Sequence, residues 1–171
     1  MKNNIHRDLP IGHKGEKRLM SILQSLGLQC WKNDGSSNNL TDWDISVKAG
    51  NKNITFEVKN DVYSLKSGNI AIETFNPKSK KQSGLSITKA DFWCHITSQV
   101  YVTPVFKLKK YLEANKPFRH IACGGDKNAT LYLYKEAEII PDIFTAFSGI
   151  SKRQLLENWN LLIQVYSNHE G

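Results

Sequence analysis

In the first third of the chain the hydrophobic positions repeat first with the period of a helix and then with the period of a strand. Apolar residues that recur at i, i+3, i+4 and i+7 predict an amphipathic helix over residues 14–26, which Gly27 ends. A short strand is expected at residues 28–31 and a loop at residues 33–41. The apolar positions of this helix are Leu19, Ile22, Leu23 and Leu26.

Two alternating segments, residues 42–47 and 54–59, predict antiparallel strands joined by a tight turn within residues 49–53. In the second strand Ile54, Phe56 and Val58 share one face, and Thr55, Glu57 and Lys59 share the other. If the apolar faces of the two strands agree, Asp44, Glu57 and Lys59 emerge on the same side of the sheet.

The rest of the chain alternates between strand and helix patterns and contains no internal repeat. We expect a single α/β domain with a core over residues 12–135, a mixed central sheet flanked by helices, and a C-terminal helical extension over residues 142–168. Ser151 and Gln154 form a capping box before the last apolar stripe. The other expected elements are strands at 69–73, 90–97 and 99–105, a basic loop at 76–84, a helix at 104–115 and a hairpin of 119–123 with 130–135.

The charge of the chain is unevenly distributed. The 171 residues include 23 Lys and Arg and 16 Asp and Glu, a net charge of +7, and 40% of residues are hydrophobic. Residues 1–125 carry 19 of the cations and 10 of the acids, a net charge of +9. A folded domain with this excess is typical of proteins that bind polyanions, although a soluble protein that keeps its net charge away from zero shows the same balance.

Membrane and secreted classes do not fit the composition. The chain contains no apolar run long enough to span a bilayer, and its first residues lack the apolar core of a signal peptide. Its three cysteines are far apart and its five histidines do not cluster, so we expect reduced thiols, no structural zinc site and a cytoplasmic protein without membrane contact.

Asp44, followed by Glu57-Val58-Lys59, resembles the signature of the PD-(D/E)xK nuclease superfamily, an acid on one strand and acid-x-Lys on the next. The resemblance covers about residues 12–75, and the leading Pro of the signature is replaced by Trp43. Residues 67–73 and 83–93 are similar to a small phage-type or homing-type branch. The resemblance implies a restriction-endonuclease-like αβββαβ core and a leading helix that supplies a further metal-site acid, here Glu16.

The same residues suit phosphodiester hydrolysis, which requires an activated water and charge stabilisation at the phosphate. We expect Asp44 and Glu57 to hold Mg²⁺, for which Mn²⁺ substitutes, with the Val58 carbonyl as a further ligand. Lys59 would orient or deprotonate the water, on the expectation that an amine beside a metal has a lowered pKa. Glu16, and Glu73 at the end of a neighbouring strand, would bind a second metal or fix the first through water.

Further polar residues surround this predicted site. Lys78, Lys80 and Lys81 are the strongest candidates for phosphate contacts, and Lys89 and Lys14 are further candidates. Asp42 is expected to cap the loop or face solvent rather than bind metal. Asp91, like Lys89, fits either a supporting role in the site or a strand-end ion pair. Ser86 and Thr88 fit either phosphate contacts or turns. His95 is expected to be a packed or surface histidine rather than a catalytic one, and Trp93 and Trp159 are expected in the core.

The functional prediction is a Mg²⁺-dependent DNA endonuclease acting on double-stranded or branched DNA. Because one site cuts one strand at a time, we expect a homodimer or higher homo-oligomer, for which the apolar C-terminal helix is a candidate interface. A Holliday-junction resolvase of the same superfamily, a non-catalytic nucleic-acid-binding domain, and a small-molecule or protein-interaction domain remain as alternatives.

Overall fold

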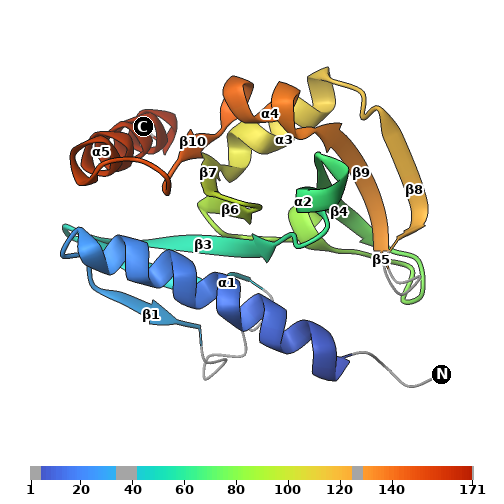
Figure 1. Cartoon of the computed structure of the whole chain (residues 1–171), viewed down its shortest axis with the longest axis horizontal. Coiled ribbons are helices and arrows are strands. Elements are labelled where there is room, and N and C mark those ends of the chain that lie inside the picture. Colours follow the sequence, from blue (N-terminus) through green and yellow to red (C-terminus); the bar gives the residue numbers. More distant parts are fainter. Residues whose placement is uncertain (1–4, 34–41, 125–128, 171) are drawn as a thin grey trace.

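The computed structural model describes residues 5–33, 42–124 and 129–170, whose strands form two sheets (Figure 1). The larger sheet has six strands in the order β1-β2-β3-β6-β7-β10, in which β3 and β6 run parallel and every other pair is antiparallel. These strands are β1 (Cys30–Lys32), β2 (Ile45–Ala49), β3 (Lys52–Asn60), β6 (Phe92–Ile96), β7 (Val100–Pro104) and β10 (Thr145–Ala146). The mixed central sheet expected from the sequence is confirmed.

The hairpin of β2 and β3 forms as the alternating pattern predicts. Ala49 pairs with Lys52 across a two-residue turn, in which Gly50 has a φ of +60°. Glycine adopts this left-handed conformation without the steric cost that a side chain would add. The turn sets the register, which places Ile54, Phe56 and Val58 in one apolar core.

Helices α1 (Ile5–Ser25) and α5 (Lys152–Glu170) cover one face of the larger sheet. Helix α1 approaches β3 closely at Gly15, where a Cβ atom would lie 2.9 Å from the Cβ of Asn60. The Asn60 side-chain amide donates a hydrogen bond of 2.7 Å to the Ile11 carbonyl. Both contacts fix α1 beside the C-terminal end of β3. The buried residues that the two helices contribute are Leu19, Leu23, Leu155, Trp159 and Leu162.

Helix α5 begins with the predicted capping box. The Ser151 amide donates to Gln154 Oε1 at 3.0 Å, and the Gln154 amide donates to Ser151 Oγ at 3.3 Å. Because the apolar stripe of α5 packs on the sheet, that stripe is not the free interface expected from the sequence; Leu156 and Leu161 are the large apolar side chains that α5 leaves exposed.

The second sheet has four strands in the order β5-β4-β9-β8. A second apolar core joins its β4 and β9 strands to helices α3 and α4 and to the opposite face of the larger sheet at Trp93. The elements of this half are α2 (Ser64–Ser67), β4 (Asn69–Asn76), β5 (Lys81–Gln82), a 3-10 turn η1 (Gly84–Ser86), α3 (Val105–Ala114), β8 (Arg119–Gly124), β9 (Ala129–Lys135) and α4 (Glu136–Ile143).

Three expectations about the elements need correction. The strand at 69–73, now β4, does not neighbour β3: β6, whose five residues are all buried, takes that place, and β4 pairs with β9 and β5. The connection from β3 to the parallel β6 therefore runs through the second sheet, with the single turn α2 and the 3-10 turn η1 as its helical parts. Helix α1 starts nine residues earlier than predicted, and α4, which contains Pro141, was not predicted.

Among the described residues, no helix has the length and apolar character needed to cross a membrane.

Candidate functional site

Asp44 lies directly before β2 and is held against β3 by two hydrogen bonds. Its backbone amide donates to the Phe56 carbonyl at 2.8 Å, and its side-chain Oδ2 accepts the Val58 amide at 2.7 Å. The ladder between β2 and β3 ends at the pair Ile45 and Phe56, which leaves the Val58 amide available to this carboxylate. Asp44 is therefore fixed beside the residues that carry Glu57 and Lys59.

Glu57 and Lys59 project from β3 on the face opposite Phe56 and Val58, as the period of two predicts. The Lys59 ammonium lies 2.5 Å from Glu57 Oε1 and 5.6 Å from the centre of the Trp93 ring on β6. Burial by itself would lower the pKa of Lys59, but the Glu57 carboxylate and other nearby acids more than offset burial, so that this pKa is raised. Without a metal ion Lys59 is therefore an ammonium ion, and the lowered pKa expected for it beside a bound metal stays a prediction.

The Asp44 carboxylate is destabilised as an anion. Burial is the main cause, and repulsion from Glu57 is the next, so that the pKa of Asp44 is raised from 3.8 to about 6. The hydrogen bond from Val58 and the charge of Lys59 act in the opposite direction without cancelling the rise. Two carboxylates that repel each other in a partly buried place are typical of sites that bind a cation or hold a proton.

Glu16 and Glu73 approach this pair from other elements. Glu16 on α1 forms an ion pair with Lys32 on β1, and its charge contributes to the raised pKa of Asp44. Glu73 on β4 accepts a hydrogen bond of 2.7 Å from Ser83 Oγ, and its charge contributes to the raised pKa of Lys59. Glu16 thus acts electrostatically on Asp44, and Glu73 acts on Lys59 although β4 belongs to the second sheet.

The described residues contain no group of three or more His, Cys, Asp and Glu side chains arranged to hold a metal ion. That Asp44 and Glu57 would hold a cation therefore stays a prediction. Their donor chemistry suits a hard ion such as Mg²⁺, which accepts few protein oxygens and keeps several waters. The Val58 amide is taken by Asp44, and a role for its carbonyl stays a prediction.

Of the two places expected for Asp42, capping the loop or facing solvent, the second is wrong, since only 8% of the residue is exposed. Its Oδ2 lies 3.0 Å from the Lys89 ammonium, and its carbonyl accepts the Lys89 amide at 3.0 Å. The neighbouring Thr88 hydroxyl lies 3.2 Å from Glu57 Oε2. The sequence leaves the role of Thr88 open, because nothing in the local pattern shows that a residue 31 positions away meets Glu57.

Asp91 supports the strands through hydrogen bonds, and it forms no ion pair with another described residue. Its Oδ2 accepts the amide and the hydroxyl of Thr55, both at 2.8 Å, and its Oδ1 accepts the Tyr166 hydroxyl from α5. Asp61 and His95 are a further buried pair that the sequence did not indicate. Trp93 Nε1 donates to His95 Nδ1 at 3.4 Å, which leaves the proton of His95 on Nε2, 3.3 Å from Asp61 Oδ2.

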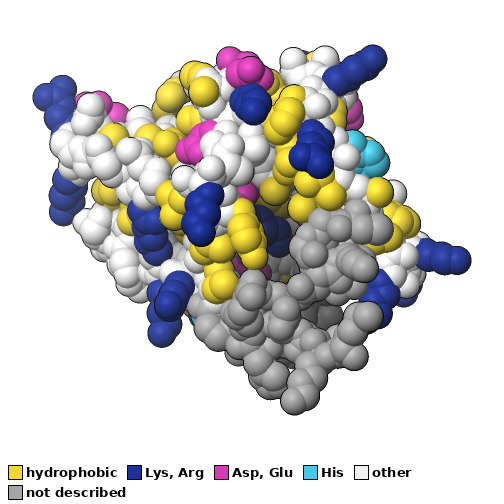
Figure 2. Space-filling view, turned by 45° about the vertical axis from the view of Figure 1, so that its right-hand side comes forward, with side chains coloured by type: hydrophobic (Ala, Val, Ile, Leu, Met, Phe, Trp, Pro, Cys, Tyr) yellow, Lys and Arg dark blue, Asp and Glu magenta, His cyan; other side chains and the backbone are white. Residues whose placement is uncertain are grey.

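The candidate phosphate-binding lysines are exposed. Lys78, Lys80 and Lys81 lie in and beside the turn between β4 and β5, which the Asn76 side chain closes by accepting the Lys78 amide at 3.0 Å. Lys14 is exposed on α1, and the Lys89 side chain is 70% exposed despite its contact with Asp42. Figure 2 shows Lys and Arg side chains distributed over the face of the molecule that it views.

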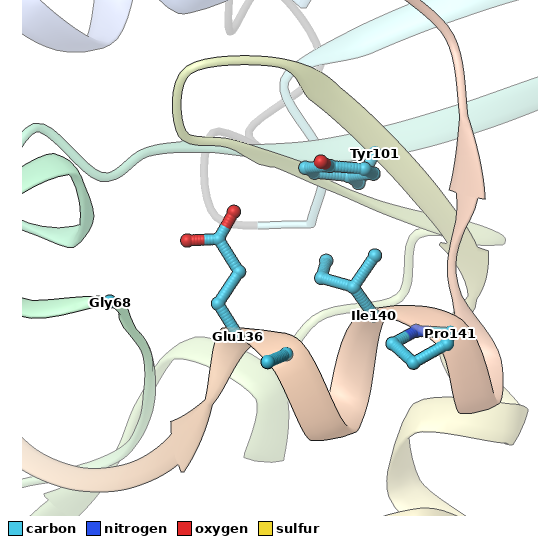
Figure 3. A pocket seen from close by; sticks show the side chains of 6 residues that line it. Gly68, Tyr101, Glu136, Ile140 and Pro141 are labelled. Atoms are coloured by element: carbon cyan, nitrogen blue, oxygen red, sulfur yellow. The ribbon is translucent and has the colours of Figure 1, made fainter.

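A separate hollow of about 410 Å³ lies between β7 and α4 (Figure 3). Glu136 and Tyr101 border it, and Glu136 Oε1 accepts a hydrogen bond of 3.0 Å from Thr97. Its other lining residues are Gly68, Ala137, Ile140 and Pro141. Among the described residues that line the hollow there is a single carboxylate and none of the predicted site residues, so its chemistry does not match that of the Asp44–Glu57 pair.

No protein-family model, curated protein or solved structure matches this chain.

Proposed function

We propose that the protein is a metal-dependent DNA endonuclease of the PD-(D/E)xK type, with Asp44, Glu57 and Lys59 as its catalytic residues. The observation that carries the proposal is the convergence of the Asp44 carboxylate, which precedes β2, with Glu57 and Lys59 on one face of β3, where the two carboxylates repel each other. Two carboxylates on an exposed surface would turn away from each other into solvent. Here the Val58 amide holds Asp44, and the strand geometry of β3 holds Glu57 beside it.

Asp44 and Glu57 would hold Mg²⁺, or Mn²⁺ in its place. When bound, the cation would polarise the scissile phosphate and lower the pKa of a water molecule. Its charge would also relieve the repulsion that raises the pKa of Asp44. Glu16 and Glu73 are close enough to act electrostatically, and we assign them to water-mediated support of the same site.

Lys59 would act as an ammonium ion. With its pKa raised by Glu57, it carries a proton at neutral pH in the metal-free protein. Its chemistry therefore suits stabilisation of the negative charge that grows on the phosphate, together with orientation of the attacking water by hydrogen-bond donation. This role differs from the general base that the sequence left open.

The exposed lysines around the turn of β4 and β5 would contact the DNA backbone. Lys78, Lys80, Lys81 and the more distant Lys14 carry charge into solvent, where each contact with a phosphate releases counterions. Lys89 would contribute its exposed side chain while its ammonium contacts Asp42. Cutting both strands of a duplex or a junction would require two such sites, and hence a homodimer or a higher homo-oligomer.

The decisive experiment is nicking of supercoiled plasmid in Mg²⁺, in Mn²⁺ and in EDTA by the wild type, Lys59→Ala and Glu57→Gln. Lys107→Ala on the exposed side of α3 is a matched control for the loss of one positive charge. We expect nicking by the wild type and the control in either metal, loss of at least a hundredfold in both site variants, and no nicking in EDTA. Equal nicking by Lys59→Ala and the wild type would refute the proposed site.

The same proteins distinguish the other functional classes. Salt-dependent DNA binding by an intact protein that nicks no linear, branched or single-stranded DNA would indicate a non-catalytic binding domain. Preferred cutting of four-way junctions over linear duplex would indicate a resolvase. A flat dependence of log K on log salt would contradict DNA binding through the lysines.

A further inference from the structure

The segment of residues 83–91, which connects β5 to β6, contacts two of the acids of the proposed site. Ser83 at its start donates a hydrogen bond to Glu73, and Thr88 near its end donates to Glu57. The segment includes the turn η1 and leads directly into β6, the parallel neighbour of β3. It therefore links acids that come from the two different sheets.

The Thr88 hydroxyl is buried and has several polar neighbours. Only 6% of the residue is exposed, and its Oγ1 lies 3.2 Å from Glu57 Oε2 and 3.2 Å from the Asp42 carbonyl, while it accepts the Ala90 amide at 3.2 Å. A hydroxyl has one hydrogen, which Glu57 and the Asp42 carbonyl must share or alternate. The charged carboxylate is the stronger acceptor of the two.

Glu57 is consequently held on both sides. Its Oε1 lies against the Lys59 ammonium at 2.5 Å, and its Oε2 lies against the Thr88 hydroxyl. With both oxygens engaged and only 8% of the residue exposed, the carboxylate has one preferred orientation. Of the two contacts of the Glu57 carboxylate, Lys59 lies on the same strand and is partly exposed. Thr88 is the contact that comes from another element of the fold.

The backbone that carries Thr88 is itself anchored at two points. Lys89 binds Asp42 twice, through its amide to the Asp42 carbonyl and through its ammonium to Oδ2, both at 3.0 Å. At the other end Gly84, with a φ of +54°, lies so close to β4 that a Cβ would be 2.4 Å from the Glu73 carbonyl oxygen. Such anchoring is what a group needs if it is to orient a catalytic carboxylate.

From these contacts we propose that Thr88 is a positioning residue that sets the orientation of the Glu57 carboxylate, with Lys89 and Asp42 as its anchor. The inference rests on the proposed nuclease function, because it concerns how Glu57 meets a divalent cation. Outer groups that hydrogen-bond to a metal ligand commonly change metal affinity by about ten- to a hundredfold when they are removed.

The test compares Thr88→Val, Thr88→Ser and a matched control, Thr103→Val. Thr103 is fully buried on β7, and its hydroxyl has no hydrogen-bond partner among the described residues, so its replacement removes a buried hydroxyl without removing a contact. Mn²⁺ binding is measured by calorimetry without DNA, and kcat and KM are measured for plasmid nicking. Circular dichroism checks that each variant is folded.

We expect Thr88→Val to weaken Mn²⁺ binding by about tenfold and to lower kcat by a similar factor, with KM for DNA unchanged. Thr88→Ser, which keeps the hydroxyl, should recover both, and Thr103→Val should match the wild type. Wild-type Mn²⁺ affinity and kcat in Thr88→Val would overturn the role of Thr88 and leave the nuclease intact. A wild type that neither binds Mn²⁺ nor nicks DNA would overturn both proposals.

Discussion

Replacing Asp44 by Asn should make the metal-free protein more stable, even though it removes a proposed catalytic group. The ionised Asp44 carboxylate is disfavoured by burial and by the charge of Glu57, which together raise its pKa from 3.8 to about 6. An Asn at this position carries no charge, and its side-chain oxygen can still accept the hydrogen bond that the Val58 amide donates at 2.7 Å.

The size of the effect follows from the two pKa values. An acid whose pKa is higher in the folded state destabilises the fold once it is ionised, so its cost is absent below pH 3.8, grows up to a pH of about 6 and is constant above it. The difference corresponds to about 3 kcal/mol at 1.36 kcal/mol per unit, and about half of that cost is already present at pH 5. For a chain of this length, about 3 kcal/mol shifts the unfolding midpoint by about 6–12 °C.

The assay is urea and thermal unfolding in EDTA at pH 5 and pH 8, with Glu113→Gln on the exposed surface of α3 as a control for the loss of a carboxylate. Asp44→Asn should be more stable than the wild type at pH 8, and the gain should fall by about half at pH 5. Saturating Mn²⁺ should stabilise the wild type more than the variant, since the wild type binds it more tightly. A destabilised variant at pH 8, or a gain that does not depend on pH, would refute the reasoning.

Two further predictions concern the residues around the site. Gly84→Ala should lower the free energy of unfolding more than Gly68→Ala does. Both glycines have a positive φ, at which a side chain costs about 1–2 kcal/mol. At Gly84 the new Cβ would in addition collide with the Glu73 carbonyl oxygen, whereas at Gly68 it would meet nothing within 4 Å. Equal midpoints in urea would contradict this close approach. Burial by itself would raise the pKa of Asp61. Hydrogen bonds from His95 and from α2 outweigh burial, so that this pKa is lowered. The stabilisation by ionised Asp61 is present above its ordinary pKa and is lost as pH falls through the lowered value. Asp61→Asn should therefore unfold more easily than the wild type at pH 7, and the difference should shrink toward pH 3; a constant difference across that range would show that the charge is not responsible.

Local sequence patterns determined the parts of the protein that depend on neighbouring residues. The alternation over residues 54–59, with Gly50 in the preceding turn, is sufficient to predict the hairpin and the shared face of Glu57 and Lys59. The Ser151 capping box likewise predicts where α5 begins. In each case the interacting groups are a few residues apart, so that turn geometry and side-chain period decide the outcome.

Tertiary structure decided which distant residues meet. The pattern of residues 69–73 identifies a strand but not its partner, and β6 rather than β4 lies beside β3 because its residues can be buried on both faces. Thr88 reaches Glu57 only because the connection between the sheets folds back over β3.

The protonation of the site has the same origin. The sequence places Lys59 two residues after Glu57, but its raised pKa and that of Asp44 depend on burial and on charges that β2, α1 and β4 bring together. A one-dimensional pattern specifies which chemical groups are present and which face of an element they occupy. Their distances, and hence their electrostatic energies, are set by the packing of elements that are far apart in the chain.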